Sequence, residues 1–311
     1  MKISVVICTY NRCESLKKTL ESLSNQGFDS CFDYEILIVD NNSKDRTKEI
    51  VETFNVGAKN IIRYIFESRQ GLSIARNRGI REAQGNIIAF TDDDCIVSEN
   101  WLQEINNIFS DGVCQGAGGK IIALWGDVMP PDWYGKKGKY EIKGGIVEYD
   151  KGSKDFIYKK EAISLPIGAN MVFQKSCFDK HGYFKEDLGL VGKKLLMGED
   201  REFCLRLIKQ SECIKYCSNL IVWHPVERHR LTEKFFLQWH YWYGYSTSIF
   251  KEEDSSKKIL KVRRYLFRQV VVNLFFWLFT ILFLGNKTKK LYYKINLNYA
   301  LGAIKGDLSL K

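Results

Sequence analysis

The chain has 311 residues, of which 45% are hydrophobic, 14% aromatic and 27% charged, and it carries a formal net charge of +10. This composition excludes an intrinsically disordered chain and leaves room for one large α/β domain with an appendage, or for two smaller domains. Nine cysteines without paired CxxC spacing, and an N-terminus that lacks the apolar length of a secretory signal, predict reduced thiols in a cytoplasmic protein.

The first 124 residues alternate short β-branched runs with amphipathic stretches, which predicts a mostly parallel sheet flanked by helices. No GxGxxG motif follows the first strand, which disfavours a nicotinamide or flavin enzyme. Asn11 and Ser43 are candidate N-caps of the first two helices. The predicted strands, apolar enough to be buried on both faces, are residues 3–9, 34–40, 60–66, 86–91 and 115–124, and further helices are predicted at 71–84 and 98–109.

Residues 125–163 break this alternation, and we interpret them as an irregular excursion of the kind that covers substrates. Regular structure is predicted to return with a strand at 165–173, a helix that opens near Gly198, strands at 214–223 and long helices beyond Thr232. The chain is therefore expected to divide into a catalytic domain, 1–230, and a helical, basic, membrane-associated region, 231–311.

An acidic triplet follows the fourth predicted strand, where open α/β sheets place their ligands. Because side chains alternate along a strand, Asp92 and Asp94 should face one site and Asp93 the opposite side. Neighbouring carboxylates are costly to keep ionised without a cation, so Mg²⁺ or Mn²⁺ is the expected occupant. The alternative is an acidic turn that caps the helix after Ser98.

Two further acidic positions are candidates. Asp40 ends the second predicted strand and is free to accept hydrogen bonds from a nucleotide base if Asn41 and Ser43 do the capping; otherwise it forms an Asx-turn or an N-cap. Glu199 and Asp200 open a helix, where the helix dipole favours carboxylates whatever their function, but where one of them can also act as a general base.

A basic cluster at 223–230 contains two of the four histidines and two arginines. The imidazole of His224 can complete a metal shell, and the guanidinium groups of Arg228 and Arg230 can hold diphosphate oxygens. A structural or merely exposed histidine is an equally weighted alternative.

Short motifs with a characteristic order run through the first 230 residues. They are SVVICTYNR at 4–12, VDNNSKD at 39–45, GLSIARNRG at 71–79 and DDD at 92–94, followed by GANM at 168–171 and the Glu199-Asp200 pair. Each motif is weak alone, but in this order the chain resembles the family-2 inverting glycosyltransferases of GT-A fold. Gln238-Trp239-His240 does not supply the QxxRW motif of the processive members, which favours the transfer of one sugar per encounter.

The resemblance implies a GT-A-like α/β fold and a metal-dependent transfer of one sugar, with inversion, from a nucleotide diphosphate sugar to an acceptor hydroxyl. A UDP-sugar is the favoured donor. The implied site comprises the base Asp200 with Glu199 supporting it, the metal ligands Asp94, Asp92 and His224, the nucleotide contacts Thr9, Tyr10, Asp40, Arg76, Asp92 and Asp93, and the diphosphate contacts Arg228 and Arg230.

The C-terminal tail is basic and apolar. Residues 251–311 hold 13 Lys and Arg against four Asp and Glu, yet 269–286 carry no charge. As a helix this stretch spans about 27 Å, slightly less than the ~30 Å hydrocarbon core, and it has basic flanks at both ends, which favours an in-plane helix over a crossing one. The alternative is a soluble helix buried against another domain or subunit. We expect a peripheral or monotopic protein at the inner face of the cell membrane, with a saccharide or lipid-linked saccharide acceptor and no nucleic acid partner.

Two other functions stay open at this point. A nucleotidyltransferase that forms sugar nucleotides also uses acids around a metal, but it favours a Gly-rich phosphate loop after the first strand, which the TYNR segment at 9–12 is not. A catalytically silent carbohydrate- or membrane-binding scaffold has no need for Asp92, Asp94 and Asp200.

Overall fold

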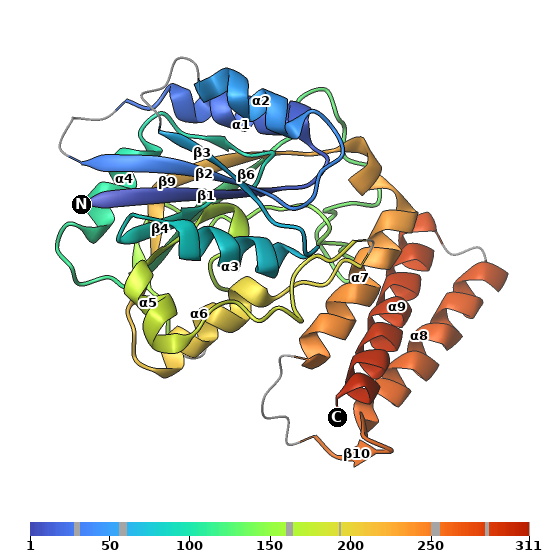
Figure 1. Cartoon of the computed structure of the whole chain (residues 1–311). Helices are drawn as coiled ribbons and strands as arrows, with labels where there is room; N and C mark the ends of the chain where they lie inside the picture. Colours follow the sequence, from blue (N-terminus) through green and yellow to red (C-terminus); the bar gives the residue numbers. More distant parts are fainter. Residues whose placement is uncertain are drawn as a thin grey trace. The chain divides into compact units, whose positions relative to one another are not determined.

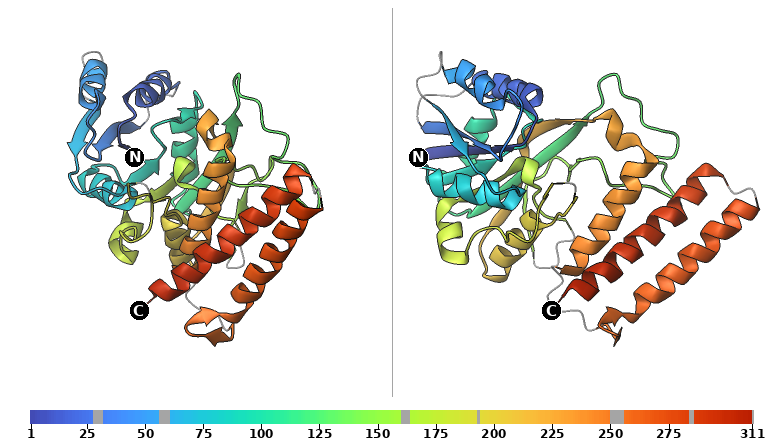
Figure 2. Two further views of the ribbon diagram at one scale, coloured as in Figure 1. Left: turned by 90° about the vertical axis from the view of Figure 1, so that its right-hand side faces the viewer. Right: turned by 45° about the vertical axis from the view of Figure 1, so that its right-hand side comes forward.

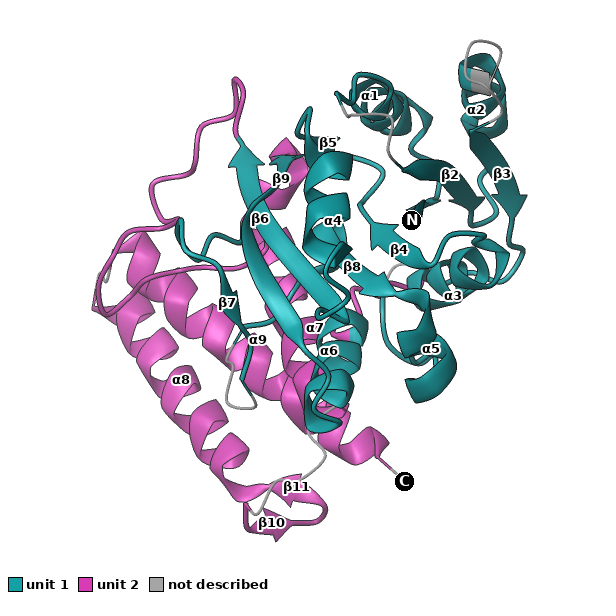
Figure 3. Cartoon of the chain, turned by 90° about the vertical axis from the view of Figure 1, so that its left-hand side faces the viewer, with its two compact units in different colours: residues 1–124, 148–189, 199–225 teal, residues 125–147, 190–198, 226–311 magenta. Residues whose placement is uncertain are grey.

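The computed structural model describes residues 1–27, 32–55, 61–159, 164–192, 194–249, 256–283 and 286–310. The chain forms two compact units (Figure 3). Unit 1 comprises residues 1–124, 148–189 and 199–225, and unit 2 comprises 125–147, 190–198 and 226–311. The sequence predicts one division near residue 230, whereas unit 2 also contains residues 125–147 of the irregular excursion and residues 190–198.

Unit 1 is built on a mixed sheet with strand order β3-β2-β1-β4-β8-β6-β9-β5, and β7 pairs with β9. Strands β3, β2, β1 and β4 are parallel, as are β6 and β9, whereas β8, β5 and β7 pair antiparallel with their neighbours. The strands are β1 (Lys2–Thr9), β2 (Asp33–Asp40), β3 (Ile62–Phe66), β4 (Ile87–Phe90), β5 (Ile96–Val97), β6 (Gly116–Leu124), β7 (Phe156–Ile157), β8 (Met171–Gln174) and β9 (Ile214–Pro225).

Helices α1 and α2 lie on one face of this sheet and α3 on the other (Figure 1). Each presents apolar side chains to the strands, and Gly79 lets α3 approach β1 so closely that a Cβ there would collide with Val6. The predicted α/β sheet flanked by helices is therefore confirmed. The helices of unit 1 are α1 (Cys13–Ser24), α2 (Thr47–Asn55), α3 (Leu72–Glu82), α4 (Trp101–Phe109), α5 (Lys175–His181) and α6 (Glu199–Lys209), with a short 3-10 turn η1 (Gly168–Asn170).

The starts of α1 and α2 differ from the prediction. Asn11 and Ser43 do not cap these helices. They connect the loop after β1 to the loop after β2, because Asn11 N donates to Ser43 Oγ at 2.9 Å and Lys44 N donates to Asn11 Oδ1 at 2.6 Å. Asp45 instead accepts hydrogen bonds from Cys13 N at 3.0 Å and Thr47 N at 3.1 Å, so one carboxylate caps both helices.

Two strand predictions and the predicted irregular excursion also need correction. The strand expected at 165–173 begins only at Met171, because η1 occupies the residues before it. The segment at 214–223 forms one long strand, β9, and not several. The excursion contains the two-residue strand β7, while its last residues, 160–163, lie outside the described residues.

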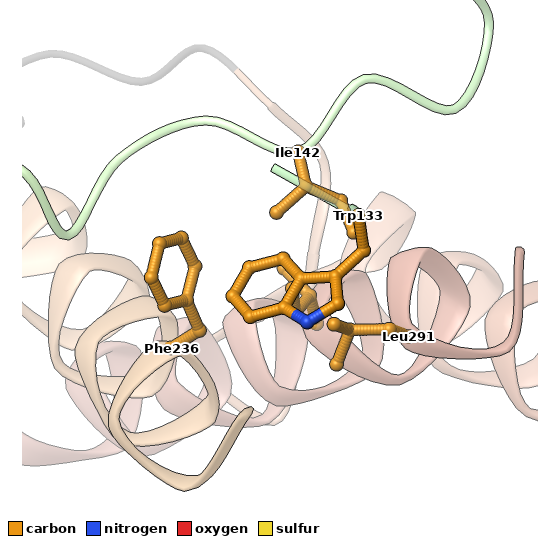
Figure 4. Packing of buried hydrophobic residues seen from close by; sticks show 5 residues of the cluster. Trp133, Ile142, Phe236 and Leu291 are labelled. Atoms are coloured by element: carbon orange, nitrogen blue, oxygen red, sulfur yellow. The ribbon is translucent and has the colours of Figure 1, made fainter. Parts of the chain in front are cut away.

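Unit 2 is a helical assembly (Figure 2). Helices α7 and α9 pack along one another, and α8 packs against α9. Trp133 and Ile142, from the irregular excursion, form a core with Phe236, Leu291 and Ile295, in which the Trp133 and Phe236 rings lie 4.8 Å apart edge to face (Figure 4). The elements of unit 2 are η2 (Arg228–Leu231), α7 (Glu233–Ile249), β10 (Lys258–Ile259), β11 (Val262–Arg263), α8 (Arg264–Leu282) and α9 (Lys287–Ser309).

Glycines set the close approach of α7 and α9. A Cβ at Gly244 would collide with the carbonyl oxygen of Tyr299, and a Cβ at Gly302 would collide with that of Tyr241. Both obstacles are backbone atoms, which cannot move aside as a flexible side chain would. The packing of these two helices therefore depends on the absence of side chains at both positions.

Replacing Gly302 by Ala should lower the free energy of unfolding by about 1–3 kcal/mol, because the overpacking outweighs the better helix propensity of alanine. Urea denaturation measures this change. Leu301→Ala, at the neighbouring exposed position, is the matched control and should change stability little. A Gly302→Ala variant as stable as the wild type would show that α7 and α9 are not in backbone contact here.

Candidate functional site

The site lies at the carboxyl edge of the parallel strands in unit 1. Because β1, β2, β3 and β4 run in the same direction, their C-terminal ends meet at one edge. The register places Thr9 opposite Asp40, and the acidic triplet follows β4 at the same edge. Thr9 is buried, whereas Tyr10, the first residue beyond β1, is 45% exposed.

The acidic triplet lies in a turn. Strand β4 ends at Phe90, so the triplet does not continue the strand, although Asp92 and Asp94 offer ligand atoms to one group, as predicted. Asp93 and Asp94 are buried, while the side chain of Asp92 is 34% exposed. Arg12 binds both buried acids, with Nη2 2.7 Å from Asp94 Oδ2 and Nε 3.6 Å from Asp93 Oδ1. Burial nevertheless raises the pKa of Asp93 to about 7, against the opposing effect of Arg12.

Asp92, Asp94, Cys95 and His224 form a group that could hold a metal ion. Each offers one ligand atom, and all four atoms lie within 4.8 Å of one another. Burial raises the pKa of the Cys95 thiol well above its ordinary value, and its soft sulfur is a poor ligand for hard cations. The two carboxylates and the imidazole remain, a set of hard oxygen donors with one nitrogen that fits a divalent ion such as Mn²⁺ or Mg²⁺.

The orientation of His224 supports this interpretation. Its Nδ1 lies 3.1 Å from the carbonyl oxygen of Pro225, and its Nε2 lies 3.4 Å from Asp94 Oδ1. With the proton on Nδ1, the Nε2 lone pair faces a carboxylate oxygen, and a cation between the two atoms relieves their repulsion. The sequence identified His224 and both aspartates of this group, and it missed Cys95.

Arg76 is buried between two acids. Its Nη1 lies 2.6 Å from Glu199 Oε1 and its Nη2 lies 3.5 Å from Asp92 Oδ1. Its guanidinium also lies within 6 Å of the Phe90 and Phe184 ring centroids, at 5.9 and 5.8 Å. Burial raises the pKa of Glu199 to about 7, the neighbouring Asp200 adds to the rise, and Arg76 opposes it. Arg76 thus joins the acid at the start of α6 to the acid that follows β4.

Asp200 is held by backbone donors. Its Oδ2 accepts a hydrogen bond from Gly168 N at 3.0 Å, and its Oδ1 accepts one from Arg201 N at 2.7 Å. A Cβ at Gly168 would collide with the guanidinium of Arg76, so only glycine fits between these two site residues. The side chain of Asp200 is half-buried and its carboxylate has a fixed orientation.

Both carboxylate oxygens of Asp40 accept hydrogen bonds within unit 1. Its Oδ1 accepts from Ser43 N at 2.8 Å, and its Oδ2 accepts from Tyr64 Oη at 2.6 Å. Asn41 does not cap α2: its amide donates to Arg69 O at 2.6 Å, and its Oδ1 accepts from Gly71 N at 2.8 Å. A contact between Asp40 and a nucleotide base stays a prediction. Each carboxylate oxygen already accepts one hydrogen bond, so a base would bind to the remaining lone pairs of these oxygens.

Arg228 and Arg230 belong to η2, in unit 2. Arg228 Nη2 lies 3.1 Å from Asp127 Oδ2, both groups being strongly exposed, and Arg230 Nε lies 3.5 Å from Glu227 Oε2. Their predicted contact with a diphosphate stays a prediction.

The roles of Arg12 and Gly168 were not predicted from the sequence. A signal for Arg12 was present, because this cation follows the first predicted strand and the acids follow a strand that pairs with it. Gly168 belongs to the GANM motif at 168–171. Its hydrogen bond to Asp200 joins residues 32 positions apart, so no local sequence pattern predicts it.

Comparison with known proteins supports the family implied by the motifs. Residues 4–182, more than half of the chain, match the family described as Glycosyl transferase family 2. The Glucosyl-dolichyl phosphate glucuronosyltransferase of Haloferax volcanii is 24% identical over 254 residues, which cover 80% of this chain and 77% of that protein. Other curated relatives match over 25 to 56% of their own length.

Solved structures show the same fold. The mannosyltransferase PcManGT from Pyrobaculum calidifontis, in complex with GDP-Man and Mn²⁺, superposes with a TM-score of 0.63 at 13% identity, over 99% of this chain and 88% of that one. S. aureus TarS 1-349 in complex with UDP-GlcNAc gives a TM-score of 0.56 at 17% identity, over 88% of this chain and 71% of that one. The GT-A-like fold predicted from the sequence is thereby confirmed. With its ordered motifs and its match over residues 4–182, this chain belongs to glycosyl transferase family 2.

Proposed function

We propose that this glycosyltransferase moves one sugar from a nucleotide diphosphate sugar, with a UDP-sugar favoured, to an acceptor hydroxyl with inversion, in the assembly of a cell-surface polysaccharide or glycolipid. The observation that carries the proposal is the group formed by Asp92, Asp94 and His224 at the carboxyl edge of the sheet. The related folds with bound GDP-Man or UDP-GlcNAc support a nucleotide sugar as donor.

In this proposal Asp92, Asp94 and His224 hold a divalent cation, Mn²⁺ or Mg²⁺. When bound, the cation supplies positive charge that stabilises the departing diphosphate. Arg228 and Arg230 add guanidinium donors to the same phosphate oxygens. Thr9, Tyr10, Asp40 and Asp93 surround the nucleotide, and Asp40 accepts hydrogen bonds from the base edge.

Asp200 is the proposed general base. The Gly168 and Arg201 amides orient its carboxylate, which takes the proton of the acceptor hydroxyl as that oxygen attacks the anomeric carbon from the face opposite the leaving group. Glu199 supports this base by fixing Arg76, and Arg76 in turn lies against Asp92. Substitution at Arg76 should therefore disturb both the base and the cation site.

A lipid-linked saccharide is the proposed acceptor class, and the inner surface of the cell membrane is the proposed location. The Haloferax volcanii relative is named for a dolichyl phosphate substrate. Helix α8, Arg264–Leu282, is the one helix among the described residues that is long and apolar enough to cross a membrane, and most of it is exposed. We propose that it attaches the enzyme peripherally or monotopically.

Replacing Asp94 by Asn should lower transfer on the order of 100-fold or more, because one charged oxygen of the proposed cation site is lost. Release of nucleotide diphosphate, with Mn²⁺ present or chelated, measures this, and calorimetry measures cation uptake. Asp111→Asn, on an exposed turn, is the control and should behave as wild type. Wild-type turnover in the chelated assay would overturn the cation's role, and absence of nucleotide diphosphate release from the wild type would favour a silent scaffold.

Replacing Asp200 by Asn should lower the rate of transfer by about 10²- to 10⁴-fold, the usual contribution of a general base. Donor affinity should change little, because Asp200 is assigned to the acceptor. Single-turnover kinetics and donor titration separate the two effects. Full turnover in a folded Asp200→Asn protein would reject this assignment.

Replacing Glu199 by Gln tests the ionisation of the buried pair. The pKa of Glu199 is about 7 in the folded chain against an ordinary value of 4.5. Between these values the folded chain keeps a proton that the unfolded chain has released. The free energy of unfolding of the wild type, relative to Glu199→Gln, should therefore fall by up to about 3 kcal/mol as pH rises from 5 to 8. A constant difference in urea denaturation would show that Arg76 keeps Glu199 ionised throughout.

A further inference from the structure

An exposed apolar tip projects from the β10–β11 hairpin of unit 2. Lys258 pairs with Arg263 and Ile259 with Val262, which leaves Leu260 and Lys261 as a two-residue turn. Both turn residues have positive φ, 49° and 68°, where asparagine and glycine are the preferred residues. Leu260 is nonetheless 85% exposed, and Ile259 is 49% exposed. Leucine is unfavourable at this position for two reasons. Its side chain strains a left-handed backbone, and its apolar surface is exposed to water.

The hairpin is fixed at its base. Val262 is buried with Leu266 and Ala303, and Arg263 makes a buried ion pair with Asp307, with Nη2 2.8 Å from Oδ1. Arg264 N also donates to Lys257 O at 2.8 Å. The tip is therefore presented on a rigid support that joins the start of α8 to the end of α9.

The hairpin leads directly into α8 (Figure 3), and most of the apolar side chains of this helix are exposed. The polar side chains of this stretch turn back to their own helix: Asn273 Nδ2 donates to Gln269 O, and Thr280 Oγ1 donates to Trp277 O. The exposed apolar residues of α8 are Phe267, Val271, Val272, Leu274, Phe275, Phe276, Leu278, Phe279, Ile281 and Leu282. The tip and this side of α8 form a patch larger than isolated surface residues.

The exposed charges beside the tip that the structure describes are cationic. Lys257, Lys258 and Lys261 are exposed beside the tip. Residues 255–306 contain 11 Lys and Arg and no Asp or Glu, and the acids at 252–254 lie outside the described residues. Apolar side chains ringed by ammonium groups match the boundary between acyl chains and anionic head groups. Cations at both ends of α8 favour an orientation along such a surface over a crossing.

We propose that Ile259 and Leu260 insert into an anionic lipid surface, with the adjacent lysines on its phosphates and α8 lying along it. This deepens the proposed membrane association, on which it rests, by naming a second anchor and its lipid class. The tip takes no part in sugar transfer, so transfer to a soluble acceptor without vesicles is expected to be the same in wild type and tip variants.

Flotation of the full chain with vesicles tests the proposal. Phosphatidylcholine vesicles with 30% phosphatidylglycerol should bind the wild type, and pure phosphatidylcholine vesicles should bind it on the order of 10-fold less. Leu260→Asn keeps the turn, because asparagine tolerates positive φ, and should weaken binding to the anionic vesicles on the order of 10-fold. Lys261→Asn should weaken binding only where phosphatidylglycerol is present.

Val113→Asn, at a 64% exposed position of unit 1, is the matched control and should bind as wild type. Unchanged flotation of Leu260→Asn, or equal binding to both kinds of vesicle, would overturn the proposal. So would a wild-type dimer in gel filtration that Leu260→Asn dissociates without any effect on flotation, because the tip would then bind a second copy. If vesicle binding behaves as expected but no transfer occurs, the proposed function fails and the anchor stands.

Discussion

Two arginines neutralise the acids at the carboxyl edge of the sheet, and the rest of the site depends on this. Arg12 binds Asp93 and Asp94, and Arg76 binds Asp92 and Glu199. Four carboxylates lie here, three of them buried, and the two arginines oppose the rise in pKa that burial gives Asp93 and Glu199. Through these ion pairs, the arginines hold the carboxylates in fixed orientations without a bound ligand.

The residues that hold the site are different from those that we expect to react. Gly168 N donates to Asp200 Oδ2 and leaves space for Arg76, while Asp45 caps α1 and α2 and so fixes the loops at the carboxyl edge of the sheet. These contacts explain why the sequence motifs contain glycine and arginine as well as acids. A reacting carboxylate in a fixed orientation loses less entropy when the substrate binds.

Local sequence patterns predicted much of this structure, and long-range pairing set the rest. Continuous apolar runs predicted β1 and β2 within one residue, and the acids after Gly198 predicted α6. The alternation rule failed for Asp92–Asp94 because β4 ends before them, and the Arg12–Asp94 pair, 82 residues apart, has no local signature. The capping of two helices by Asp45 and the packing of Trp133 on Phe236 also join residues far apart in the sequence, so no local pattern predicts them.

The placement of Trp133 and Ile142 in the core of unit 2 limits how this enzyme can be shortened. The backbone passes between the two units after residues 124, 147, 189, 198 and 225. A truncation after residue 225 would remove Phe236, Leu291 and Ile295 and leave an indole and an isoleucine without their apolar neighbours. The result would be an aggregation-prone fragment, so the full chain suits purification of this enzyme better than a chain without its tail.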